Sequence, residues 1–129
     1  QKLVDASMLS PQYFFQLWRS RDLGVDIPVM CATTSDLFAL YKHWAESANE
    51  FRRTQRYFSQ ELARCAGVVA KRVSIKYPRE EALHTTHRVW VINDDEGVQR
   101  PGESGIEFVA RRCREFRLGL IQCGIIREE

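Results

Sequence analysis

The chain has 129 residues, of which 44% are hydrophobic, and a formal net charge of +2. This length and composition exclude a disordered chain and predict one α+β domain, mostly α, over residues 1–129. No apolar run approaches the roughly 20 residues of a membrane span. The motifs GxxxxGK[ST] and GxSxG do not occur in the sequence. We therefore expect no enzyme activity, cofactor, metal or membrane contact in this chain.

The charge is distributed unevenly along the sequence. The segment from Arg52 to Arg88 contains nine lysines and arginines but three acidic residues, a charge of +6, whereas the rest of the chain carries −4. A basic segment in an otherwise acidic chain is typical of a protein that binds a polyanion. The alternative is that these charges only solvate a surface.

The first predicted helix spans about residues 10–22. Ser10-Pro11 provides a cap and a favoured first helical residue, and Gly24 is expected to end the helix. Its apolar face includes Phe14, Leu17 and Trp18, with Tyr13 and Phe15 beside it. Residues 25–30 predict an extended connector with apolar anchors.

The second predicted helix begins near Ser35, after capping residues that include Thr33 and Asp36. Its apolar residues recur every three or four positions and therefore share one face: Leu37, Leu40, Tyr41 and Trp44. We expect the helix to end at Asn49.

A third helix is predicted from about Thr54, its cap, to Ala66, with Gly67 as its stop. Its inward face would be Tyr57, Phe58, Leu62 and Cys65, and its outward face is Gln55, Arg56, Ser59, Gln60, Ala63 and Arg64. A helix that only needs solvation usually carries mixed Glu and Lys. Arg, Gln and Ser can instead bond phosphates and base edges, so this composition indicates a nucleic-acid-reading helix.

A basic hairpin follows the third helix. Residues 68–77 are rich in β-branched side chains and predict a strand that Pro78 ends, and residues 87–91 predict its partner. Two helices followed by a two-stranded hairpin are the order of a winged helix-turn-helix, and we predict that fold with its core at about residues 35–92. His84 and His87 have no Cys or carboxylate of matching spacing nearby, so we expect them to lie near phosphate rather than bind a metal.

The last predicted helix spans about residues 106–120, after an acidic turn at residues 93–96 that we expect to be solvated. Its apolar stripe is Ile106, Val109, Cys113, Phe116 and Leu120. Packing on its own domain is the default interpretation, and a self-association seam is the alternative. The arginines at positions 111, 112, 114 and 117 could extend a DNA surface or pair with the acidic turn.

The four cysteines stand far apart, without a Cys-x-x-Cys motif, and most occupy positions that look buried. Together with the lack of a signal peptide, this pattern predicts a reduced, intracellular protein of the cytoplasm. Because the chain begins with Gln1 and not with methionine, we expect it to be a segment of something longer.

Two stretches, 35–46 and 53–62, resemble the C-terminal domain of the primase–helicase replication proteins of satellite phages, plasmids and large DNA viruses. The shared pattern is a helix containing Leu40-Tyr41 and Trp44, followed by a polar helix centred on Phe58 and Leu62 that ends near a glycine. The hairpin that ends in Arg88-Val89-Trp90 fits the same pattern, so the resemblance covers about residues 35–92.

The resemblance implies an origin-binding winged helix at the end of a larger initiator with helicase, primase and ATPase modules. Its partner would be double-stranded DNA with origin repeats, in a bacterial host or a virus-infected cell. The residues expected to contact DNA from the third helix and the hairpin are Arg52, Arg53, Thr54, Gln55, Arg56, Ser59, Gln60, Arg64, Lys71, Arg72, Lys76, Arg79, His84, His87 and Arg88. The competing hypotheses are a protein-docking winged helix and a phage or plasmid transcription repressor.

Overall fold

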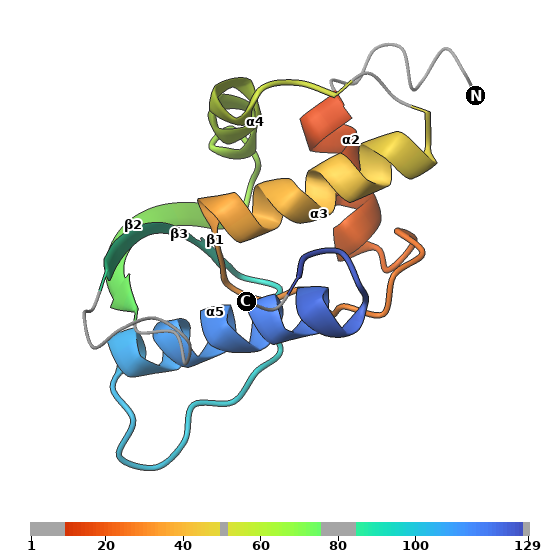
Figure 1. Ribbon diagram of the computed structural model, residues 1–129. Coiled ribbons are helices and arrows are strands. Elements are labelled where there is room, and N and C mark those ends of the chain that lie inside the picture. Colours follow the sequence, from red (N-terminus) through yellow and green to blue (C-terminus); the bar gives the residue numbers. More distant parts are fainter. Residues whose placement is uncertain (1–9, 50–51, 76–84, 128–129) are drawn as a thin grey trace.

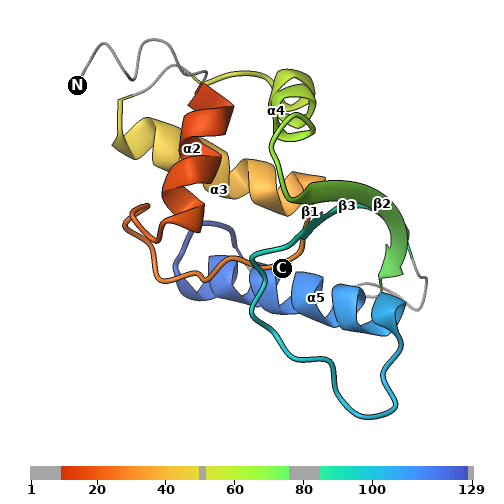
Figure 2. The same ribbon diagram turned by 180° about the vertical axis from the view of Figure 1, so that it is seen from behind.

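The computed structural model describes residues 10–49, 52–75 and 85–127 of the chain. These residues form an α+β domain with a small antiparallel sheet (Figure 1). Its elements are α2 (Ser10–Arg19), β1 (Ala32–Thr33), α3 (Thr34–Ser47), α4 (Gln55–Leu62), β2 (Val68–Ile75), β3 (Thr85–Ile92) and α5 (Gly105–Gln122). Figures 1 and 2 show α2, α3 and α4 gathered on one side of the domain and α5 on the other.

The helices begin where side chains cap them. The Thr33 hydroxyl accepts a hydrogen bond from the Asp36 amide at 3.2 Å, and the Thr54 hydroxyl accepts one from the Tyr57 amide at 3.2 Å. Both caps satisfy amides that have no partner inside the helix. The starts predicted for α3 and α4 are therefore confirmed.

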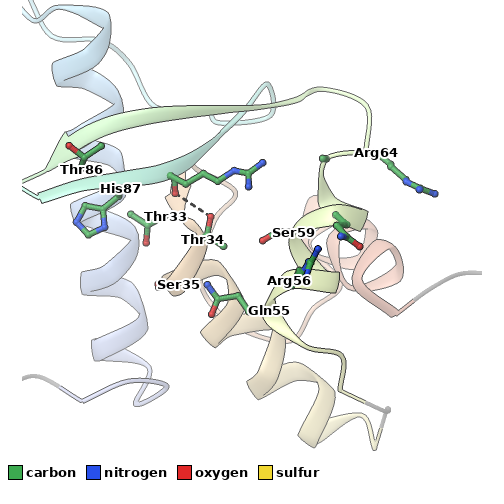
Figure 3. Close-up of a pocket in the computed structure, with 12 residues that line it drawn as sticks. Thr33, Thr34, Ser35, Gln55, Arg56, Ser59, Arg64, Thr86 and His87 are labelled. Carbon is green, nitrogen blue, oxygen red and sulfur yellow. Dashed lines mark hydrogen bonds between the residues drawn. The ribbon is translucent and has the colours of Figure 1, made fainter.

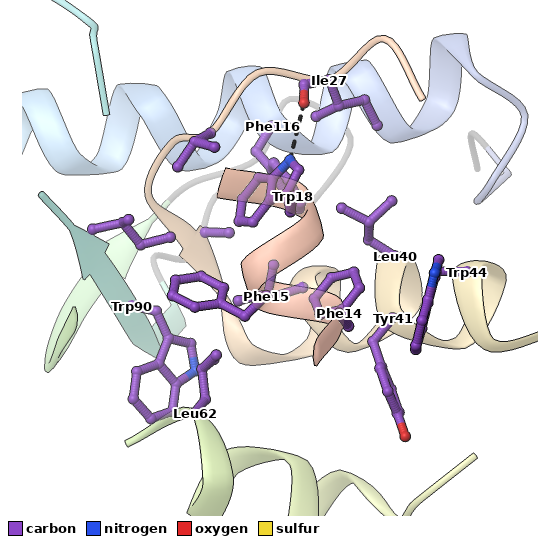
Figure 4. Packing of buried hydrophobic residues seen from close by; sticks show 14 of the residues in the cluster. Phe14, Phe15, Trp18, Ile27, Leu40, Tyr41, Trp44, Leu62, Trp90 and Phe116 are labelled. Carbon is purple, nitrogen blue, oxygen red and sulfur yellow. Dashed lines mark hydrogen bonds between the residues drawn. The ribbon is translucent and has the colours of Figure 1, made fainter. Parts of the chain in front are cut away.

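An aromatic core joins the helices on both sides of the domain (Figure 4). Tyr41 of α3 stacks on Phe58 of α4, with ring centroids 4.9 Å apart. Trp18 of α2 meets Phe116 of α5 edge-on at 5.6 Å, and its indole nitrogen donates a hydrogen bond to the Ile27 carbonyl at 2.9 Å. Because Phe116 is fully buried, α5 is an integral part of the domain.

The sheet has the strand order β1-β3-β2, so β3 pairs antiparallel with both neighbours. Ala70 lies opposite Trp90, and Arg72 lies opposite Arg88. Side chains alternate between the faces of a strand. Trp90 accordingly joins the core with α2, α3 and α4, whereas Val89 joins a second buried cluster with residues of α5.

Two predicted helix ends were wrong. α4 ends at Leu62 rather than Ala66, because the chain tightens there: the Arg64 amide donates to the Glu61 carbonyl, three residues back, at 3.1 Å. Gly67, with φ of +80°, then leads the chain into β2. α2 ends at Arg19, and the first left-handed residue after it is Arg21, with φ of 64°, three residues before Gly24, whose φ is 89°.

Parts of the predicted apolar faces were also wrong. Tyr57 and Cys65 are half-buried, and Tyr57 lies under the Arg53 guanidinium, whose carbon is 4.6 Å from the ring centroid. In α5, Ile106 is 67% exposed, whereas Phe116 and the rest of the C-terminal part of the stripe are buried. Most of the seam available for self-association is thus covered by this domain itself.

The acidic turn at residues 93–96, which we expected to be solvated, instead packs against the domain through Asp95. The Asp95 side chain is 4% exposed and lies 2.8 Å from Nη2 of Arg112. It also accepts hydrogen bonds from the amides of Cys31 and Gly97, at 2.9 and 2.8 Å. Arg112 of α5 therefore fixes the acidic turn. Of the cysteines, Cys31 and Cys113 are buried as expected, but Cys65 and Cys123 are not.

Candidate nucleic-acid interface

An open groove of about 1130 Å³ separates α4 from β3 and the start of α3 (Figure 3). Its described lining residues are Thr33, Thr34, Ser35, Gln55, Arg56, Ser59, Gln60, Ala63, Arg64, Thr86, His87 and Arg88. None of these residues carries a carboxylate, and every side chain except that of Ala63 can donate a hydrogen bond. Such a lining favours an anionic ligand with many acceptor atoms.

One face of α4 supplies the polar wall of the groove. Phe58 and Leu62 are fully buried, so the opposite face of the helix, with Gln55, Arg56 and Gln60, points outward. The single acidic residue of α4, Glu61, is 4% exposed and turned inward, where it accepts a hydrogen bond from Gln12 Nε2 at 2.8 Å. The outward face of α4 therefore presents Gln, Arg and Ser without a negative charge.

Thr34 fixes the opposite wall. Its hydroxyl donates to the Arg88 carbonyl at 3.2 Å, drawn as a dashed line in Figure 3. The same hydroxyl accepts a hydrogen bond from Trp90 Nε1 at 2.9 Å. One side chain thus joins the first turn of α3 to two residues of β3, and so sets the position of the strand relative to the helix.

The hairpin adds a second, smaller hollow beside the groove. This hollow of about 290 Å³ is lined by Ala70, Lys71, Arg72 and Arg88. Arg88 belongs to both hollows, and its guanidinium carbon lies 5.0 Å from the centroid of the Trp90 ring. Because Trp90 is buried, this stacking holds the guanidinium end of the Arg88 side chain against a rigid support.

The cations of the groove and hairpin differ from most arginines of α2 and α5 in their partners. On α2 and α5, arginines pair with carboxylates: Arg19 with Asp94 at 2.5 Å and Arg117 with Asp36 at 3.1 Å are examples. Within the described residues, no carboxylate pairs with the cations of the groove and hairpin, which are Arg56, Arg64, Lys71, Arg72 and Arg88. Their positive field is therefore not cancelled locally.

The structure brings together about half of the predicted DNA contacts. Those that line the groove are Gln55, Arg56, Ser59, Gln60, Arg64, His87 and Arg88. Lys71 and Arg72 are exposed beside it. Lys76, Arg79 and His84 lie outside the described residues.

Three predicted contacts precede α4 and do not line the groove. Arg52 is exposed, and Thr54 caps the helix. The Arg53 amide donates to the Tyr41 hydroxyl at 2.9 Å, and its guanidinium stacks on Tyr57. These residues position α4 and border the interface rather than form its wall.

The structure adds groove residues that the sequence-based prediction did not include. In the sequence, Thr33, Thr34 and Ser35 stand at the predicted start of α3, and Thr86 immediately precedes the strand predicted at residues 87–91. They join the site because the start of α3 packs beside β3. The run Thr33-Thr34-Ser35 was a signal for donors at a helix start, where anions bind well, but its neighbourhood could not be read from the sequence.

The arginines of α5 take no part in this groove. Arg111 lies 2.8 Å from Glu103, and Arg112 lies 2.8 Å from Asp95. The expected pairing with the acidic turn is observed for Arg112, whereas Arg117 pairs with Asp36 of α3.

The described part of the chain contains neither a metal-binding cluster nor a membrane-spanning helix. There, no three side chains of His, Cys, Asp or Glu gather closely enough to hold a metal ion, and no helix is long and apolar enough to cross a bilayer. Comparisons of the chain with protein-family models, curated proteins and solved structures gave no match. The physical features of the groove are therefore the basis for a functional proposal.

Proposed function

We propose that this domain is a winged helix that binds double-stranded DNA in the groove between α4 and the hairpin. The main support is the lining of that groove, where arginine, glutamine and hydroxyl donors gather and no described residue carries a carboxylate. The order helix, strand, helix, helix, strand, strand with β3 in the centre of the sheet fits a winged helix. The chain would bind and not catalyse.

In this proposal α4 reads base edges in the major groove. An α-helix with its side chains is about 10–12 Å across, which suits a major groove about 12 Å wide. Gln55 and Gln60 can pair with adenine, and Arg56 with guanine. The hairpin residues Lys71 and Arg72 would contact the backbone.

Duplex DNA suits the groove better than a single strand does. Proteins that bind single strands stack successive bases on aromatic side chains. No Phe, Tyr or Trp is among the described residues that line this groove. The large aromatic side chains Trp18, Tyr41 and Trp90 are buried in the core instead. The chemistry of the lining thus supports contacts with phosphates and base edges.

The biological role comes from the sequence resemblance. We propose recognition of repeats at a replication origin by the C-terminal domain of a primase–helicase initiator, inside a bacterial host or a virus-infected cell. A transcription repressor would use the same residues on an operator. A protein-docking module would use the basic groove to bind an acidic partner, and would show little affinity for DNA at physiological salt.

The test compares a duplex selected by this domain from a random pool with an unselected duplex of the same length. Arg56→Ala is expected to remove roughly 1–3 kcal/mol of discrimination, since a bidentate base contact has that value. Lys71→Ala should weaken both duplexes alike, because phosphate contacts do not depend on sequence. Arg100→Ala removes an exposed arginine outside the groove and serves as the matched control. Equal losses on both duplexes with Arg56→Ala would contradict base reading by α4.

A further inference from the structure

The β2–β3 hairpin contains a like-charged pair that weakens the sheet. Arg72 and Arg88 are direct partners in the antiparallel register, so their side chains leave the same face of the hairpin. Direct partners in such a pair have Cβ atoms about 4.5–5.5 Å apart, and like charges there are destabilising. Both side chains are exposed, and no carboxylate of the described residues pairs with either. The arrangement costs stability in the free protein.

The surroundings of this pair are suited to an oxyanion. The next pair on the same face is Ser74 with Thr86, which adds two hydroxyl donors. Lys71 and the two arginines line one hollow of about 290 Å³. The guanidinium of Arg88 stacks on the Trp90 ring, with its carbon 5.0 Å from the ring centroid. Guanidinium groups bind phosphate through paired hydrogen bonds, which makes arginine well suited to this position.

We propose that Arg72 and Arg88 together bind one phosphate group, and that this phosphate removes the repulsion between them. In the DNA complex it would be a single phosphodiester of the backbone beside the groove. This inference rests on the proposed function for the identity of the phosphate. It goes beyond that function in two ways. It assigns two arginines to one phosphate, and it predicts that binding of this phosphate stabilises the β2–β3 hairpin.

Thermal unfolding tests the site without DNA. Pyrophosphate should raise the Tm of the unchanged protein above its value in sodium chloride of equal ionic strength. Arg72→Gln should raise the Tm in chloride by about 1–4 °C, as expected for relief of one cross-strand repulsion, and should reduce the response to pyrophosphate. Arg100→Gln removes an exposed arginine outside this hollow. It should change neither the Tm in chloride nor the rise in Tm that pyrophosphate causes. A lower Tm for Arg72→Gln in chloride, or an unreduced response, would overturn the proposal.

The salt dependence of duplex binding tests whether the phosphate is shared. Each phosphate contact contributes about 0.9 to the slope of log Kobs against log salt. Arg72→Gln or Arg88→Gln alone should reduce the slope by less than about 0.9, because the remaining arginine still contacts the shared phosphate. The double variant should reduce the slope by about 0.9, because that one phosphate is then lost. A double variant that loses about 1.8 would show two separate phosphates and refute the shared site. Failure of the unchanged protein to bind duplex would count against the proposed function, while the pyrophosphate experiment would still decide the site.

Discussion

Removal of the Asp95 carboxylate should be among the most damaging single changes in this domain. Asp95 is 4% exposed and contacts Arg112, which is itself 13% exposed, at 2.8 Å. It also accepts the amide hydrogens of Cys31 and Gly97. Deleting one partner of a buried ion pair costs about 3–5 kcal/mol, because the other charge is left without compensation. Glu115, 2.7 Å from Arg112, compensates part of that charge, so we expect about 3 kcal/mol for Asp95→Ala.

This loss should be visible in thermal and urea denaturation. Small domains have a total stability of about 5–15 kcal/mol, and for this chain length we expect a decrease in Tm of about 10 °C. Glu96→Ala is the matched control. Glu96 pairs with Arg21, but the two side chains are 75% and 66% exposed, and exposed pairs contribute about 0–1 kcal/mol. Equal effects of the two substitutions would refute the structural role assigned to Asp95.

The same carboxylate should make stability depend on pH. Burial favours the neutral form of Asp95, but hydrogen bonds from Arg112 and from the Gly97 and Cys31 amides outweigh it, so its pKa is lowered. Its folded pKa lies below the unfolded value of about 3.9, so the stabilisation is present above that value and is lost as the pH falls through the folded pKa. The free energies of unfolding of the unchanged protein and Asp95→Ala should therefore converge below about pH 4. A constant difference down to acid pH would contradict this assignment.

Two further predictions concern the groove wall and the thiols. Thr34→Val should cost about 1–3 kcal/mol in urea denaturation, because the buried Trp90 Nε1 loses its acceptor; an unchanged midpoint would show that this hydrogen bond contributes nothing. Burial raises the pKa of Cys31 to about 11 and that of Cys113 further. Iodoacetamide should therefore modify the exposed Cys123 first, as read by peptide mass spectrometry. Equal labelling of Cys31, Cys113 and Cys123 before unfolding would contradict the burial of Cys31 and Cys113.

The sequence predicted those features of the fold that depend on neighbouring residues. Thr33 and Thr54 mark helix starts because a hydroxyl next to a helix caps amides two or three residues further on. The core side of α3 could be predicted for the same reason, since Leu37, Leu40 and Tyr41 lie on one face of any regular helix. Both inferences need only a few consecutive residues, and the structure confirms them.

Features that depend on distant residues were missed. The two-residue strand β1 exists only because Ala32 pairs with Trp90, and no local pattern marks it. Asp95 looked like a solvated turn residue because its partners Cys31 and Arg112 come from elsewhere in the chain.

In the candidate site too, features that depend on neighbouring residues could be predicted and features that depend on distant residues could not. The polar face of α4 follows from helical periodicity, so the sequence placed Arg56 and Ser59 on one side of this helix, and both line the groove. The opposite wall required knowledge of how α3 packs on β3, so Thr34 and Thr86 were not expected there. The register that places Arg72 opposite Arg88 also became visible only with the paired strands.

Fluorescence anisotropy with the unchanged protein and a labelled duplex tests duplex DNA binding most directly. We take Arg56 as a base reader, Arg64 and Lys71 as phosphate contacts, and Arg72 with Arg88 as sharing one more phosphate. Three phosphates give a slope of about −2.7, so affinity should fall at least about 40-fold between roughly 50 and 200 mM salt. A single strand of the same sequence should bind less tightly. Absence of duplex binding at both salt concentrations would contradict DNA binding by this domain and favour an acidic protein partner.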